Sequence, residues 1–313
     1  MSASDEEIIR VQELWFNDGN LVVQAENHLY RVTKGILAAR SPIFSDMLSF
    51  PQPPDSDLVD GCPAVRLPDS AGDVTVFLKA IFDSSFFEPP PSSAELSGIL
   101  GVLRLSHKYD VQYLRRRALL HLETAYPVTL EAYDARETAS TFTRTSTGHI
   151  LVAEVAQQVE AQWIVPCALY RASCYGLKAI LGPGQTLSSL RRACIMAFPQ
   201  HALAYTSRPP FLLLLPLQGL CESEERCKLI YRVFMKAWET SDRVVHRGPD
   251  VLREWAHRIG ILKKISITPP CRPCREHLIV RLTQQREQWW NAMPSLYSLP
   301  DWGELTSIRD SSL

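Results

Sequence analysis

The chain has 313 residues, of which 46% are hydrophobic and 21% are charged, and its formal net charge is -1. This length is enough for one large or two modest domains with a substantial buried core. The near-neutral charge, without a long run of like charges, argues against a nucleic-acid-binding protein. Composition alone indicates a globular protein and leaves its chemistry open.

The start of the chain and its apolar runs bear on location. The segment "MSASDEEIIR" is acidic and lacks the apolar stretch of a secretory signal. The longest apolar run, "FLLLLP" at 211–216, is too short to cross a bilayer. Eight cysteines in such a chain are expected to stay reduced. We therefore expect a protein of the cytoplasm or nucleus that does not contact membranes.

Residues 14–32 predict strands joined by tight turns. The strands "LVVQA" (21–25) and "HLYRV" (28–32) flank Glu26-Asn27, which predicts a two-residue hairpin with Asn27 in the left-handed region. In the preceding turn, Asp18-Gly19 is expected to supply a positive-φ position. We expect residues 1–13 to be a flexible N-terminus.

From Thr33 the apolar spacing becomes helical. Ser41-Pro42 predicts the start of a second helix, with Ser41 as its N-cap, and Leu37 and Phe44 are expected to be buried. After a short strand, "AVRLP", comes an amphipathic helix capped by Asp69 or Ser70, whose apolar face comprises Val74, Phe77, Leu78, Ile81 and Phe82. Ser92 and Glu95 have the spacing of a capping box before the next helix.

The second half of the chain has a different character. Strand signals end near Pro127, and helical spacing of apolar residues recurs from there to the C-terminus. The sequence therefore predicts an α-helical C-terminal domain over residues 127–313.

Several segments of residues 14–125, taken together and in order, resemble the BTB/POZ domain family. They are "LWFNDGNLVVQAENHLYRV", "KGILAARSPIFSDML", "AVRLPDSAGDVTVFLKAIFD" and "LGVLRLSHKYDVQYLRRRALLHL". The chain departs from the family at Thr33, where histidine is usual. Its long inserts and helical second half are similar to the expanded set of such proteins in mushroom-forming fungi, whose roles are mostly unassigned. The resemblance implies an α+β domain over residues 14–126, in which a small sheet lies beside a helical cluster.

The same resemblance implies self-association. Domains of this family dimerise through the first helical pair and the N-terminal segment, each copy offering the same face to the other. On this pair, the surface positions Lys34, Arg40 and Asp46 are the expected interface residues. We therefore expect a homodimer and protein partners.

The loop residues Phe86, Phe87 and Glu88 suggest a second partner surface. Related BTB adaptors present a hydrophobic residue and a glutamate near this point to dock the cullin scaffold of ubiquitin ligases. A ring can fill a pocket while the carboxylate sets the register. The alternative is that Phe86 or Phe87 folds back on its own domain.

The cysteines of the second half are the candidate metal ligands. "CRPCREH" places Cys271, Cys274 and His277 at successive i, i+3 steps near a helix start, and Cys221 and Cys227 can complete a four-coordinate zinc site. The alternative is a set of partly buried free thiols that bind no cofactor. A thiol oxidoreductase is less favoured, because no βαβ pattern surrounds the C-x-x-C. Three further cysteines are expected to be core residues: Cys167, Cys174 and Cys194.

No catalytic motif stands out, since the chain has no G-x-S-x-G, H-E-x-x-H or P-loop pattern. We therefore expect a non-enzymatic protein-interaction protein, either a substrate adaptor of a cullin-type ubiquitin ligase or a nuclear scaffold or transcriptional co-regulator. A thiol- or zinc-dependent enzyme is the outside alternative.

Overall fold

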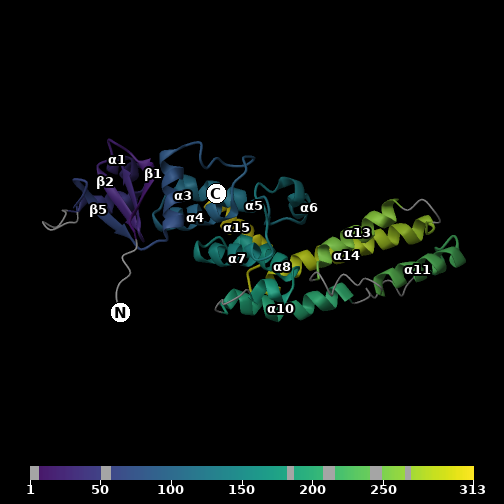
Figure 1. Cartoon of the computed structure of the whole chain (residues 1–313). Coiled ribbons are helices and arrows are strands. Elements are labelled where there is room, and N and C mark those ends of the chain that lie inside the picture. The colour runs from purple at the N-terminus through teal and green to yellow at the C-terminus, as the bar shows by residue number, and fades with distance from the viewer. Residues whose placement is uncertain (1–6, 51–57, 182–186, 207–215, 240–248, 265–268) are drawn as a thin grey trace.

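The computed structural model describes residues 7–50, 58–181, 187–206, 216–239, 249–264 and 269–313, and within them the side chains of all but 205–206 and 233–239. These residues form an α+β fold, with a small curled five-stranded sheet at the N-terminal end followed by helices (Figure 1). The expected fold class is confirmed at this level.

The sheet has the strand order β1-β3-β2-β5-β4. Its strands are β1 (Ile9–Trp15), β2 (Leu21–Ala25), β3 (His28–Val32), β4 (Leu58–Val59) and β5 (Cys62–Leu67). The predicted hairpin of β2 and β3 is confirmed, with Ala25 opposite His28. Strand β1 is parallel to β3, and β5 is parallel to β2. Because β1 begins at Ile9, the prediction of a flexible terminus through residue 13 is wrong.

Two turn predictions are also wrong. The left-handed residue of the β2–β3 turn is Glu26, with φ 51, and not Asn27. In that place the Glu26 carboxylate accepts a 3.0 Å hydrogen bond from the backbone N–H of Ala71, at the start of the next helix. Gly19 does not adopt a positive φ; instead, a Cβ atom there would lie 2.8 Å from Cγ of Arg31, so the close approach of β3 requires glycine.

The helices of the N-terminal part are α1 (Lys34–Arg40), α2 (Pro42–Ser49), α3 (Ala71–Phe82), α4 (Leu96–Lys108) and α5 (Gln112–Glu123). Ser41 caps α2 as predicted, since its Oγ accepts a 3.0 Å hydrogen bond from the N–H of Phe44. Leu37 and Phe44 are fully buried, also as predicted. The predicted capping box before α4 does not form: Ser92 instead donates to the Glu88 carboxylate.

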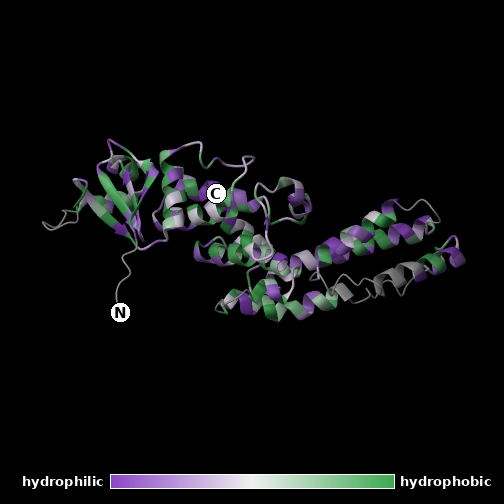
Figure 2. Ribbon diagram, viewed as in Figure 1, coloured by the Kyte–Doolittle hydropathy of each residue, from purple (hydrophilic) through white to green (hydrophobic). Residues whose placement is uncertain are grey.

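Every described element after β5 is helical, so the predicted helical second half is confirmed within those residues. Its elements are α6 (Leu130–Ala139), α7 (Gly148–Gln158), η1 (Gln162–Ile164), α8 (Val165–Ser173), α9 (Leu177–Leu181), α10 (Ser189–Thr206), α11 (Glu224–Glu239), α13 (Val251–Lys264), α14 (Arg272–Leu296) and α15 (Trp302–Ser312). Helices α13 and α14 pack side by side and extend away from the sheet, and α11 lies at the same far end (Figure 1). Along α13 and α14, hydrophobic residues alternate with hydrophilic ones, as expected for helices with one buried face (Figure 2).

One hydrophobic core links the strand-containing part to the helices that follow it. The cluster of buried side chains runs from Leu14 in β1 to Leu305 in α15 without a break at residue 126. A separate, smaller cluster joins α13 and α14 around Trp255 and Leu282. The distal α13–α14 pair therefore carries its own small core.

None of the helices in the described residues has the length and apolar character needed to cross a membrane. Residues 211–215 of the apolar run "FLLLLP" lie outside the described residues.

Candidate metal centre

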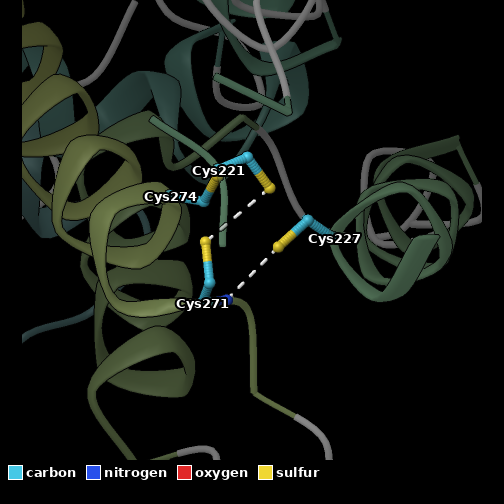
Figure 3. Close-up of side chains that lie close together, drawn as sticks. All are labelled: Cys221, Cys227, Cys271 and Cys274. Atoms are coloured by element: carbon cyan, nitrogen blue, oxygen red, sulfur yellow. Dashed lines mark hydrogen bonds between the residues drawn. The ribbon is translucent and has the colours of Figure 1, made fainter. Parts of the chain in front are cut away.

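Four cysteines from two distant stretches of the chain meet at the far end of the α13–α14 pair (Figure 3). Cys271 is the N-cap of α14, and Cys274 lies in the first turn of that helix. Cys227 lies in the first turn of α11, and Cys221 is on the turn that precedes α11. Two of the four therefore come from the start of α14, and the other two from the start of α11 and the turn before it.

The local sequence explains why these stretches turn where they do. Pro273 occupies the first turn of α14, where its missing N–H has no helical partner to lose. On the other side, Gly219 adopts φ 71, which glycine tolerates best, in the turn closed by the hydrogen bond from Cys221 N–H to the Leu217 carbonyl. Glu224 and Glu225 lie in the first turn of α11, where the helix dipole favours carboxylates.

The sulfur atoms have the spacing of a mononuclear metal site. All four Sγ atoms lie within 4.8 Å of one another, and the Sγ atoms of Cys221 and Cys271 are 3.8 Å apart. Zinc binds cysteine sulfur at about 2.3 Å in a tetrahedron, which places ligand sulfurs about 3.8 Å apart. The four thiols can therefore hold a metal ion with only a small contraction of the group.

Backbone N–H groups point at the sulfurs. The Cys271 N–H donates to Cys227 Sγ at 3.2 Å. Burial opposes ionisation of Cys271, but hydrogen bonds from the backbone of Cys274 and Glu222, together with those from the Cys274 and Cys227 thiols, outweigh it and lower the pKa of the Cys271 thiol to about 7. Burial raises the pKa of Cys227, and raises that of Cys274 to about 12. Without a metal, Cys271 is the thiol of the group that ionises most readily. A bound cation would stabilise the other three cysteines as thiolates as well.

The predicted fifth ligand, His277, does not belong to this group. It follows Cys274 by one helical turn, and its Nε2 is buried without a hydrogen-bond partner, so that burial lowers its pKa. Since four thiols already complete a tetrahedral shell, the structure removes His277 from the candidate ligands.

The remaining cysteines are placed as expected. Cys167, Cys174 and Cys194 are all buried in the main core. The eighth cysteine, Cys62, is 8% exposed in β5 beside the Gly19 carbonyl, far in sequence from the four-cysteine group.

The loop after α3 places its three candidate partner residues differently. Phe86 is 43% exposed, and the Lys79 ammonium lies 5.6 Å from the centre of its ring. Glu88 is exposed as well. Phe87, however, is only 4% exposed and packs against the ring of His121 at 5.3 Å. Phe87 is thus a core residue, which corrects its place in the partner-binding set.

The predicted interface residues Lys34, Arg40 and Asp46 are all exposed on α1 and α2. Three apolar side chains on or next to this helical pair are also exposed, a feature that the helical spacing did not predict: Ile36 (41%), Ile43 (44%) and Phe50 (69%).

A comparison with models of known protein families finds no match for this chain, and a search of curated proteins finds no relative.

Proposed function

We propose that the chain is a non-enzymatic protein-interaction protein in which a structural zinc ion joins the starts of helices α11 and α14. The observation that carries the zinc assignment is the four-sulfur group, with Sγ atoms within 4.8 Å of one another. Four thiolates suit zinc, which accepts cysteine sulfur in tetrahedral sites, better than they suit magnesium or calcium, which prefer oxygen.

The donor set favours a structural role over a catalytic one. Catalytic zinc sites keep one position for water or substrate, whereas structural sites are closed by four protein ligands. Here Cys221, Cys227, Cys271 and Cys274 would fill all four positions. When bound, the ion would join the start of α11 to the start of α14, which are more than 40 residues apart in the sequence.

Chelation tests this assignment. We expect a strong chelator to remove one zinc per chain and to lower the helical circular-dichroism signal, because the ion bridges two helix starts. Cys271→Ser should bind no zinc, whereas Cys62→Ser, which also loses one thiol, should keep a full equivalent. If the purified chain carries no zinc and its helical signal does not change when zinc is added, the assignment is wrong.

For the N-terminal part we propose a BTB/POZ-type domain that forms an isologous homodimer. The sheet with its helical cluster supports this, as do the exposed Ile36 and Ile43 beside Lys34, Arg40 and Asp46. Light scattering tests it: the wild-type chain should have twice the 35.4 kDa mass of one copy. Ile36→Asp/Ile43→Asp should be monomeric, and a wild-type monomer at micromolar concentration contradicts the proposal.

Between the two interaction roles, the exposed pair Phe86 and Glu88 favours a cullin-binding adaptor of the cytoplasm or nucleus. A pull-down with the wild-type chain should recover a cullin, and Phe86→Ala/Glu88→Ala should lose it. Absence of a cullin in both samples rules the adaptor out and leaves the nuclear scaffold or co-regulator, which needs dimerisation alone.

A further inference from the structure

The four thiols are not equally reachable from solvent. Cys227 is 4% exposed, and Cys271 and Cys274 are each 1% exposed, whereas Cys221 is only partly buried. Cys221 also lies on a turn, whereas the other three are fixed at helix starts. A small dissolved reagent therefore meets Cys221 first.

Cys271 offers Cys221 a disulfide partner within close reach. Its Sγ lies 3.8 Å from the Sγ of Cys271, and a disulfide requires the two sulfurs to approach to about 2.05 Å. The approach needed is less than 2 Å, and Cys221 lies on a turn rather than within a helix. Cys271 and Cys274, by contrast, lie on the same helix start, so a bond between them would tie α14 only to itself.

Helix α11 contacts the start of α14 through this group. Within residues 224–232, the hydrogen bond to another helix is the one that Cys227 Sγ accepts from the N–H of Cys271. Besides Cys227, Tyr231 lies against the small core of α13 and α14. A metal ion on Cys227 would be the strongest of these attachments, because it would bond α11 directly to both cysteines of α14.

We propose that the four-cysteine site is an oxidation-sensitive latch, in which a hydroperoxide converts Cys221 and Cys271 to a disulfide, expels the metal and releases the start of α11. This inference rests on the proposed zinc site. In the reaction, one thiolate attacks a peroxide oxygen and becomes a sulfenic acid. The second thiolate then attacks the sulfenic sulfur and displaces its oxygen, which leaves as water after protonation. Two thiolates, one hydrogen peroxide and two protons thus give one disulfide and two waters, and zinc leaves the two remaining sulfurs.

After oxidation, the turn that carries Cys221 and the helix that carries Cys227 are held differently. The Cys221–Cys271 disulfide keeps the turn before α11 tied to α14, so the chain does not unfold there. Cys227, in contrast, loses the ion and keeps a single hydrogen bond. Release should therefore be local to α11 and should be reversed by a reductant with added zinc, since sulfenic acids and disulfides are reducible.

The test treats the purified full chain, with its zinc content measured first, with one equivalent of hydrogen peroxide. We expect a metallochromic dye to report zinc release, peptide mass spectrometry to find the Cys221–Cys271 disulfide, and amide hydrogen exchange in residues 224–232 to accelerate at least tenfold. Dithiothreitol with zinc should restore the original exchange rate.

Two variants sharpen the result. Cys221→Ser, which also loses a zinc ligand, should form no disulfide between the turn before α11 and α14 when treated with peroxide, whereas Cys62→Ser, which removes a thiol elsewhere, should form the Cys221–Cys271 disulfide and release zinc as the wild type does. A zinc-loaded wild type that resists excess peroxide, forms the Cys271–Cys274 disulfide instead or keeps its exchange rate in 224–232 overturns the latch and leaves the zinc site standing. A chain that never binds zinc overturns both.

Discussion

Arg309 in the last helix, α15, donates to the carboxylate of Glu123 at the end of α5, 186 residues earlier in the chain, with Nη2 and Oε2 3.3 Å apart. Glu123 also accepts a 3.1 Å hydrogen bond from the indole N–H of the fully buried Trp163. One carboxylate thus holds the C-terminal helix and η1 against the N-terminal part.

We therefore expect Glu123→Gln to lower the free energy of unfolding by about 1.5–3 kcal/mol, the cost of weakening charge-assisted hydrogen bonds at a mostly buried carboxylate. Asp310 is the matched control, because it is the exposed second partner of Arg309. Asp310→Asn should change stability by less than about 0.5 kcal/mol in urea denaturation. Equal effects of the two variants contradict the assigned role of Glu123.

Ser41 joins the first helical pair to the domain core. Its fully buried Oγ accepts from the N–H of Phe44 and donates to the carbonyl of Tyr109, whose ring stacks on Phe44 at 4.5 Å. Ser41→Ala should cost roughly 1–3 kcal/mol, because it removes an N-cap and leaves a buried carbonyl unpaired. Ser49→Ala, which removes an exposed hydroxyl from the same helix, should stay within about 0.5 kcal/mol in the same urea titration.

The buried histidines predict a loss of stability in acid. Burial, helped by nearby arginines, lowers the pKa of His149 to about 3, and burial lowers that of His201 to about 4, from 6.5 in the unfolded chain. Below pH 6.5 the unfolded state therefore binds protons that the folded state does not. The stability contributed by each neutral ring should be present above pH 6.5 and be lost as pH decreases, with a slope that approaches about 1.4 kcal/mol per pH unit for each ring near pH 5.

Urea denaturation between pH 5 and pH 7 measures this slope. His201→Gln should reduce the loss of stability between pH 7 and pH 5 by about 2 kcal/mol in total. A His201→Gln slope equal to that of the wild type contradicts the role given to burial.

The sequence predicted most of the N-terminal fold because its signals are local. Ser41-Pro42 marks a helix start by residue type alone, and the β2–β3 hairpin follows from alternation around a two-residue turn. What failed depends on tertiary contacts: Glu26 takes the left-handed position, where its carboxylate caps α3, and Gly19 is required by the approach of Arg31. Neither contact can be read from neighbouring residues.

The candidate metal centre was predictable in part for the same reason. The C-x-x-C at a helix start fixes Cys271 and Cys274 on one side, but only the fold brings Cys221 and Cys227 to them across more than 40 residues. His277 has a suitable spacing along the helix and yet lies outside the group. The residue types and their spacing predicted the candidate ligands, and the packing of the helices determines which of them lie together.

Truncation of the two adjacent phenylalanines in the loop after α3 should lower stability by very different amounts. Phe87→Ala removes a ring packed on His121 in the core and should cost about 3 kcal/mol or more. Phe86→Ala removes an exposed ring and should cost less than about 1 kcal/mol, the value of its contact with Lys79. Thermal unfolding of the two variants measures the difference, and a larger loss in Phe86→Ala contradicts the placement of the loop.

The zinc centre is tested most directly by elemental analysis of the purified chain together with cobalt substitution. We predict one zinc per chain, and a cobalt-substituted protein with the visible absorption of a tetrahedral four-thiolate site, both lost in Cys271→Ser and kept in Cys62→Ser. Wild-type protein that carries less than about a tenth of an equivalent of zinc and gives no such cobalt spectrum would contradict the account.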